Sequence, residues 1–300
     1  MKPLPTLFFC LTLTVAAAEP VKNEKAGSAS KKSTAGNVLR SVRSLDDGSV
    51  GNVYELKLPG GVTMKFCYCP PGKFQMGSSE GENGRLADED QVGVEISKGF
   101  WIAQTECTQA QWLAVMEINP SRIIAPTRPV ENMTWGECQD FPIKCNLLKT
   151  VPRGWQMALP TEAQWEYACR AGTTSLYSFG NDASQLHRYG NFADKTSSML
   201  SGDRNQDDGM GDCSAKVARY VANPWGLYDM HGNVSEWCMD WYGESLPKGK
   251  DPKGAISGVV RVHRGGSWRH DASGCRSASR HNSPSGERLH SLGFRPVLVQ

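Results

Sequence analysis

The chain lacks a strong excess of charge of either sign, and it lacks the compact signatures of common nucleotide and hydrolase sites. Its 33 Lys and Arg residues nearly balance its 31 Asp and Glu residues, so neither nucleic acid nor a membrane surface is favoured as a partner. It contains no P-loop, no GxGxxG fingerprint and no Ser–His–Asp signature. Beyond the N-terminus, no segment reaches the ~18 apolar residues that a membrane-spanning helix needs. The function must therefore be sought in other residue patterns.

The N-terminus is typical of a secretory signal peptide. Lys2 supplies the positive charge, Leu7–Val15 the short apolar region, and Ala16–Ala18 the small residues of a cleavage site. We expect residues 1–18 to be removed and the mature protein to be secreted or periplasmic. Cys10 could instead mark lipid attachment, but the two Phe residues before it are too bulky for a lipobox.

A flexible linker over residues 19–49 and one domain over residues 50–300 are expected next. The linker is rich in Lys, Ser, Ala and Gly and has too little apolar surface to fold. The domain contains short segments typical of strands and two with helical periodicity, Thr108–Met116 and Thr161–Arg170, each with a Thr cap. The stretch 173–225 is dominated by Gly, Asn, Asp and Ser, and a loop region that long needs a ligand, metal or disulfide to organise it. The pattern predicts an α+β domain with many loops.

Two acidic, glycine-containing segments could hold a hard cation. Asp229 and Glu236 bracket a turn at Gly232, and the carbonyls of Gly232 and Val234 could turn inward beside the two carboxylates. Carboxylate and carbonyl oxygens are the ligands that calcium prefers. The segment 205–212 is similarly acidic, but it lacks the glutamate that an EF-hand requires. A solvated turn is the alternative interpretation of both segments.

The segment 264–295 carries the strongest indication of function. It is dense in Gly, Arg, Ser and His, has one cysteine, Cys275, and is too polar for a core element. We expect a tight Gly turn, a long surface loop and a returning strand, and loops of this kind often carry function. His270, Asp271 and His281 could form a site for an anionic or polar ligand, or they could be ordinary loop residues.

Several blocks, spread from about Met64 to Arg295, occur together in a fixed order. They are Pro70–Ser78, Thr105–Gln109, Pro129–Trp135, Leu159–Arg170, Gly226–Trp237, Arg264–Trp268 and Gly293–Arg295. This set resembles the formylglycine-generating enzyme family, also called the sulfatase-modifying factor family. The resemblance implies a single compact α+β domain of the formylglycine-generating enzyme type, loop-rich and related to the C-type lectin fold.

The resemblance also implies two structural calcium sites. The residues that fall on one site are Asp229, Gly232, Val234 and Glu236, and those that fall on the other are Asn191, Phe192, Asp208 and Met210. Phe192 and Met210 would contribute carbonyls. Family enzymes have Asn where Asp229 stands, and Asp is at least as good an oxygen ligand. Calcium would then order the loop-rich middle of the chain.

The catalytic positions depart from the family pattern. The enzymes convert a sulfatase cysteine to formylglycine with oxygen and a Cu(I) held by two cysteines, and soft thiolates select that ion. The first of these positions is His270 here, and Cys275 is the only thiol nearby. Ser267 and Arg280 are retained. Because one thiol cannot form a two-thiolate site, we do not expect copper.

Nine cysteines remain after the signal peptide, so at least one is free or pairs between chains. In an exported protein many of them would be oxidised, and their spacing does not indicate zinc. One bridge of the vertebrate enzymes starts at the position of Cys169, and its partner position aligns with Ser277, two residues beyond Cys275. The resemblance therefore implies a Cys169–Cys275 bridge, which would make Cys275 inert.

Two functions remain open. In the first, the protein is a secreted, calcium-stabilised accessory or ligand-binding domain without copper chemistry. The residues expected to face its glycan, peptide or protein ligand are Trp268, Arg269, His270, Arg276 and His281. In the second, it is an oxidase acting on a sulfatase, with Ser267, Cys275 and Arg280 in a remodelled metal site that includes His270 or His281. The absent copper cysteines favour the first.

Overall fold

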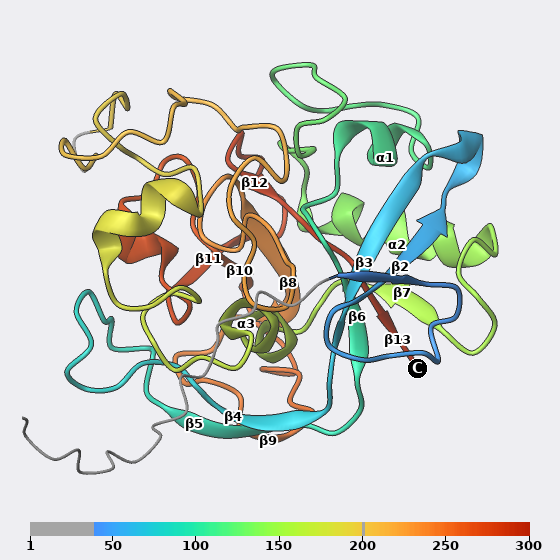
Figure 1. Ribbon diagram of the computed structural model, residues 1–300, viewed down its shortest axis with the longest axis horizontal. Coiled ribbons are helices and arrows are strands. Elements are labelled where there is room, and N and C mark those ends of the chain that lie inside the picture. Colours follow the sequence, from blue (N-terminus) through green and yellow to red (C-terminus); the bar gives the residue numbers. More distant parts are fainter. Residues whose placement is uncertain (1–38, 200–201) are drawn as a thin grey trace, which may run out of the picture. The chain divides into compact units, whose positions relative to one another are not determined.

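Six short strands form the largest sheet of the computed structural model, which describes residues 39–199 and 202–300 (Figure 1). Their order is β1 (Arg40–Val42), β2 (Asn52–Lys57), β3 (Thr63–Cys69), β6 (Phe100–Ala103), β13 (Val297–Val299) and β7 (Gln156–Ala158). All neighbours are antiparallel except β1 and β2. Because the C-terminal strand β13 lies between β6 and β7, both ends of the described chain belong to one sheet.

The start of the domain lies earlier than its composition suggests. Residues 40–49, expected in the linker, contain β1, which pairs in parallel with β2. Leu45 is 4% exposed, and its carbonyl accepts a hydrogen bond from Trp101 Nε1 at 3.0 Å. Residues 40–49 therefore join the sheet despite their low apolar content, because β1 pairs with β2 and Leu45 is buried in the core. The expected signal peptide lies outside the described residues.

Two smaller sheets complete the strand framework. The four-stranded sheet has the order β11 (Arg280–Pro284), β10 (Val260–Arg264), β8 (Ser235–Trp241) and β12 (Leu292–Gly293). The three-stranded sheet has the order β4 (Gly72–Met76), β5 (Val92–Ile96) and β9 (Gly249–Lys250). The segment 264–295 turns at Gly265 and Gly266, where φ is positive, and returns as β11, as expected. The stretch between the turn and β11 is irregular, but much of it, including Cys275, Arg276 and Ser277, is buried and does not lie on the surface.

Three α-helices begin at threonine caps. They are α1 (Gln109–Leu113), α2 (Trp135–Leu147) and α3 (Glu162–Arg170). Each has a capping box, in which the threonine hydroxyl accepts from the backbone of the third helical residue and that residue's side chain returns a bond. The helices near Thr108 and Thr161 are confirmed, whereas α2 was not expected, because Pro142 interrupts its pattern. Three 3-10 turns are also present: η1 (Pro59–Gly61), η2 (Ala183–Arg188) and η3 (Ala272–Cys275).

The stretch from 173 to 225 is almost entirely loop, and Asn233 organises much of it (Figure 1). Its Oδ1 accepts hydrogen bonds from Asn191 Nδ2 at 3.2 Å and from the Ala215 amide at 2.7 Å. Its Nδ2 donates to Glu106 Oε1 at 2.9 Å. With φ at +66°, Asn233 adopts a left-handed conformation that asparagine tolerates better than most residues. One buried amide therefore ties the long loop to the Asp229–Glu236 turn.

The core combines aromatic packing with buried ion pairs. Trp101, Trp165 and Trp237 are fully buried, and Trp165 Nε1 donates to Glu236 at 2.7 Å. The result is a single α+β domain with sparse regular structure, as expected. Among the described helices, none is long and apolar enough to cross a membrane.

Candidate functional site

A cleft of about 580 Å³ opens over the four-stranded sheet, beside the turn after β10. The residues that line it are Met199, Ser235, His263, Arg269, His270, Arg280, His281, Asn282, Ser283, Leu289, Ser291 and Leu292. Strands β8, β10 and β11 supply most of the polar wall, and the 289–292 segment supplies leucines. Among the described lining residues there is no Asp or Glu, so the cleft favours ligands that carry negative charge or hydroxyl groups.

Three histidine rings form a row in this cleft. The His281 ring lies 4.4 Å from His270 and 5.5 Å from His263, measured between ring centroids. Burial lowers the pKa of His270 to about 3, and the neighbouring His281 adds to the effect. Burial also lowers the pKa of His263 and of His281. At neutral pH the row is therefore uncharged and presents ring nitrogens as hydrogen-bond donors and acceptors.

The position of the family's first copper cysteine is occupied by a hydrogen-bonded imidazole. His270 Nδ1 lies 2.9 Å from Ser267 Oγ, and Ser267 is fully buried beneath the turn. This contact orients the His270 ring, which lines the cleft. Ser267 therefore influences the cleft by positioning His270.

The arginines of segment 264–295 divide sharply into paired and unpaired side chains. The paired ones are Arg264 with Glu166, Arg276 with Glu89, Arg280 with Glu162, Arg288 with Glu137, and Arg295 with Glu236. Arg269 is exposed, and within the described residues its guanidinium makes no hydrogen bond or ion pair. Its one partner is the Trp268 ring, 5.6 Å away. Arg269 is thus the one cleft arginine whose charge is uncompensated.

Two arginines of the expected sites, one expected to bind a ligand and one to be catalytic, are held by buried glutamates. Arg276 is 1% exposed, contacts Glu82 and Glu89 on the chain that precedes β5, and does not line the cleft. Arg280 does line it, but its guanidinium is held by Glu162 and by the carbonyls of Asp88 and Gly243. Both arginines neutralise buried glutamates and hold the domain together.

Cys275 does not lie among the described residues that line the cleft. It is fully buried in an apolar cluster with Tyr177, Leu186 and Phe192, and burial raises the pKa of its thiol. A protonated thiol is a poor nucleophile and a poor metal ligand. The described residues also contain no group of three or more His, Cys, Asp or Glu side chains placed to hold a metal ion.

The expected Cys169–Cys275 bridge is not formed. All nine cysteines of the described residues are free thiols. The His231 ring contacts both residues, since its nitrogens lie within 4.0 Å of Cys169 Sγ and its Nδ1 lies 2.9 Å from the Cys275 carbonyl. The bridge was expected only from the position of a disulfide in the vertebrate enzymes, and that comparison gave no sign that the His231 ring contacts both cysteine residues.

The Asp229–Glu236 turn forms a buried cluster of charge. The Glu236 carboxylate receives two hydrogen bonds from Arg295, at 2.6 and 2.7 Å. Asp229 Oδ2 accepts from the Ala218 amide at 2.7 Å, whereas its Oδ1 is buried without a partner. Glu106, which the sequence reasoning did not single out, adds a second orphaned oxygen, Oε2. Burial and the nearby Asp229 raise the pKa of Glu106. Glu106 and Asp229 therefore lie close together in the interior, near Glu236, whose carboxylate is bound by Arg295.

The second expected calcium position also contains an orphaned oxygen. Asn191 Oδ1 is buried without a hydrogen-bond partner. The Asp208 carboxylate accepts from the amides of Phe192 and Met210, each at 2.8 Å, and burial raises its pKa to about 6. The Met210 carbonyl accepts from the Thr196 hydroxyl. The structure thus places the four expected residues around one loop.

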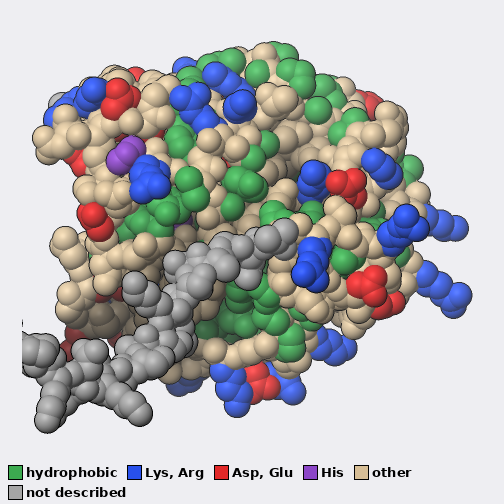
Figure 2. All heavy atoms as spheres, in the orientation of Figure 1, with side chains coloured by type: hydrophobic (Ala, Val, Ile, Leu, Met, Phe, Trp, Pro, Cys, Tyr) green, Lys and Arg blue, Asp and Glu red, His purple; other side chains and the backbone are tan. Residues whose placement is uncertain are grey.

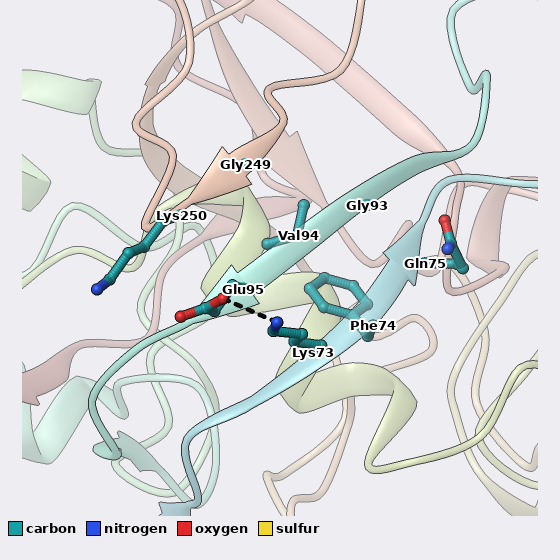
Figure 3. Close-up of a pocket in the computed structure, with 8 residues that line it drawn as sticks. All are labelled: Lys73, Phe74, Gln75, Gly93, Val94, Glu95, Gly249 and Lys250. Atoms are coloured by element: carbon teal, nitrogen blue, oxygen red, sulfur yellow. Dashed lines mark ion pairs between the residues drawn. The ribbon is translucent and has the colours of Figure 1, made fainter.

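A second hollow, of about 500 Å³, lies on the three-stranded sheet (Figure 3). Lys73 and Glu95 point toward one another across neighbouring strands and form an ion pair at 3.3 Å, while Lys250 extends from β9. Among the described residues that line it, no buried side-chain nitrogen or oxygen lacks a partner. Figure 2 shows that basic and acidic side chains are interspersed over the visible face. The hollow therefore has the chemistry of an ordinary sheet surface.

The family is decided by a comparison with protein-family models. Residues 62–299 match the model of the sulfatase-modifying factor enzyme 1-like domain. The chain belongs to the sulfatase-modifying factor family. Within this family it is similar to the formylglycine-generating enzyme of Thermomonospora curvata, with 31% identity over 208 residues that cover 65% of this chain and 63% of that one.

Other relatives show that the family domain occurs in different proteins. The serine/threonine-protein kinase pkn1 of Chlamydia caviae is 30% identical over 257 residues, which cover 75% of this chain and 36% of the kinase. The chain thus spans about a third of that relative. Treponema denticola variable protein 1 has a similar structure, with a TM-score of 0.69, 27% identity and coverage of 82% of this chain and 98% of that one. PvdO from Pseudomonas aeruginosa, at 22% identity and a TM-score of 0.67, shares the fold.

Proposed function

We propose that this member of the sulfatase-modifying factor family is an exported, calcium-stabilised ligand-binding or accessory protein without copper oxidase chemistry. The observation that carries the proposal is the state of the only thiol near the expected copper positions. By resemblance His270 stands at the first position, where it lies within hydrogen-bonding distance of Ser267, and the second falls near Ala272 or Ser273; Cys275, nearby, is buried in an apolar cluster. No cysteine is among the described residues that line the cleft, so the two-sulfur site that suits Cu(I) has no counterpart there.

Calcium is supported by the family resemblance and by two unpartnered oxygens in the buried turn, on Glu106 and Asp229. Glu236 is bound by Arg295, and the described acidic side chains do not by themselves form a group of three placed to hold an ion. Backbone carbonyls, such as those of Gly232 and Val234, would therefore have to complete the site. The orphaned oxygens of Glu106 and Asp229 are hard ligands of the kind calcium takes. Asn191 and Asp208 would hold a second ion by the same chemistry, and in both places calcium would order loops.

The ligand would bind in the cleft above the four-stranded sheet. Neutral histidines, serines and the free Arg269 suit a polar or anionic group on a glycan, a peptide or an exported protein partner such as a sulfatase. The N-terminal signal pattern supports export, which would bring the protein to such partners. The formylglycine-generating enzymes in the family make a sulfatase the first partner to test.

The oxidase alternative predicts that the protein converts a peptide cysteine to an aldehyde, which mass spectrometry can detect. The purified protein is incubated with Cu(I), oxygen and a peptide carrying Cys-x-Pro-x-Arg, and mass spectrometry is used to look for the aldehyde. We expect no aldehyde and no copper retention. Turnover that is abolished by Cys275→Ser and kept by Cys213→Ser, a partly exposed control thiol, would overturn the proposal in favour of an oxidase.

Export can be tested by expression of the full chain in a bacterium. The mature protein is collected from the periplasm or medium, and its N-terminus is sequenced. We expect cleavage after Ala18. Retention of the full-length chain in the cytoplasm would contradict the exported role without bearing on the chemistry of the cleft.

A further inference from the structure

The cleft contains one uncompensated positive charge and no negative charge among its described lining residues. Arg269 is exposed, stacks on Trp268 and has no acidic partner within the described residues. Of the two lining arginines, Arg280 is neutralised by Glu162. An unpaired guanidinium beside neutral polar side chains is the arrangement that recognises an oxyanion, because its fork of donors matches two oxygens.

Two buried polar atoms in the cleft wall have no partner. Ser235, on β8, is 1% exposed and its Oγ makes no hydrogen bond. His263, on β10, is 6% exposed; its Nε2 lies 3.2 Å from Ser283 Oγ, and its Nδ1 is unpartnered. Both residues line the cleft. Buried polar groups are nearly always satisfied, so two orphans in one cavity wall indicate that something else completes them.

These two observations are independent and meet in one cavity. Arg269 supplies charge at the exposed rim, and Ser235 and His263 supply unsatisfied polar atoms in the wall. His263 is uncharged at neutral pH, so its ring can donate or accept without repelling Arg269. The sheet face and the 267–270 turn hold these groups around one cavity.

We propose that this cleft is an oxyanion-binding subsite, in which Arg269 pairs with a sulfate, phosphate or carboxylate group of the ligand and Ser235 and His263 contact its oxygens or an adjoining hydroxyl. The proposal rests on the proposed function, since it assumes that this cleft binds a ligand. It narrows the ligand to a class: an acidic sugar, a phosphorylated or sulfated molecule, or a peptide carboxylate.

The test is a titration of the full mature protein with sodium sulfate, sodium phosphate and sodium acetate at constant ionic strength. Histidine ring protons are followed by NMR, because the cleft holds three of the six histidines of the chain. We expect saturable shifts of the His263 and His270 signals with at least one anion. The anion that binds most tightly identifies the source as a sulfate ester, a phosphate ester or a carboxylate. The absence of saturable shifts with all three would overturn the proposal.

Variants separate charge recognition from general salt effects. Arg269→Gln should weaken binding by about tenfold or more, because an ion-assisted hydrogen bond is lost. Arg288→Gln, which changes an exposed arginine paired with Glu137 outside the cleft, should leave binding unchanged. Equal affinities of Arg269→Gln and the unmodified protein would contradict the assignment.

A second variant tests the orphaned hydroxyl without removing charge. Ser235→Ala deletes an atom that has no partner in the fold, so the melting temperature should hold while the anion affinity falls severalfold. A purely structural serine would behave in the opposite way.

Failure of the anion titration together with absence of aldehyde formation would leave the non-oxidase role standing and reject the subsite alone. Aldehyde formation would reject the proposed function itself.

Discussion

Removing the two orphaned charges of the Asp229 turn should distinguish a calcium site from ordinary buried hydrogen bonds. The double variant Glu106→Gln, Asp229→Asn keeps the side-chain oxygens that accept from Asn233 Nδ2 and the Ala218 amide. It removes the two acids whose ionisation a bound cation would favour, since burial raises the pKa of Glu106 and raises that of Asp229 to about 6. Each amide has nearly the size and shape of the carboxyl group that it replaces, so the shape of the turn should survive.

The expected magnitude follows from mass action. If the free calcium concentration is a hundred times the dissociation constant, binding adds about 2.7 kcal/mol to the free energy of unfolding. In a domain of this length, 1 kcal/mol shifts the melting temperature by ~2–4 °C. The unmodified protein should therefore melt about 5–10 °C higher in calcium than in EDTA.

The two proteins should change order between the two conditions. In EDTA the double variant should be at least as stable as the unmodified protein, because it no longer buries two acids whose pKa values are raised by that burial. In calcium it should gain little and become the less stable of the two. Differential scanning calorimetry of both proteins in 1 mM EDTA and in excess calcium measures this crossing. Glu95→Gln, which breaks an exposed pair with Lys73, is the matched control and should show the same rise in melting temperature from EDTA to calcium as the unmodified protein.

Two results would refute the reasoning. If the unmodified protein melts at one temperature in EDTA and in calcium, the turn binds no structural ion. If the double variant loses as much stability in EDTA as in calcium, the carboxylates act as hydrogen-bond acceptors and their charge is irrelevant.

Three further predictions concern the segment that forms the cleft. His270→Gln should reduce the loss of unfolding free energy between pH 7 and pH 5 by about 2 kcal/mol. Histidine in the unfolded chain binds a proton below its usual pKa, whereas folded His270, with its pKa lowered to about 3, does not. Urea titrations at the two pH values measure the free energies of unfolding, and an equal loss in the variant and the unmodified protein would contradict the prediction. Arg264→Met should cost roughly 3–5 kcal/mol of unfolding free energy, since it leaves Glu162 and Glu166 buried without this partner; a urea midpoint equal to that of the unmodified protein would exclude a stabilising pair. Gly266→Ala should lower the melting temperature, because φ is +67° and the added Cβ would lie 2.6 Å from a backbone oxygen; unchanged melting would show that the turn relaxes freely.

Local features were predictable where the chain supplies its own partners. The helix after Thr108 was expected from its threonine cap and apolar spacing, and the helix after Thr161 from its capping box; both are confirmed. The helix after Thr134 has the same box but was not expected, and it contains Pro142, a residue that usually ends a helix. In the fold it survives because its buried face packs against the aromatic core, where Phe141 stacks on Trp112.

The loop expected between the Gly265 turn and β11 is largely buried, where a surface loop was expected, for a physical reason. Arginines look solvent-exposed in a sequence, but Arg264 and Arg276 are neutralised by glutamates about a hundred or more positions away in the chain. The pairing of such distant charges is set by tertiary structure and leaves no periodic signal. For the same reason Glu106 was missed as a calcium-ligand candidate, since only folding brings it beside Asp229.

By itself the sequence determined the family and the α+β class, and it showed that Cys275 is the only cysteine of the segment 264–295, because these depend on residue identity and order. The tertiary structure decided which of those residues are available. It buried Cys275, paired five of the six arginines of the segment and left Arg269 free at the rim of a cleft with two unsatisfied polar atoms. Burial and charge compensation are properties of the packed molecule, since they depend on neighbours that the chain brings together only when it folds.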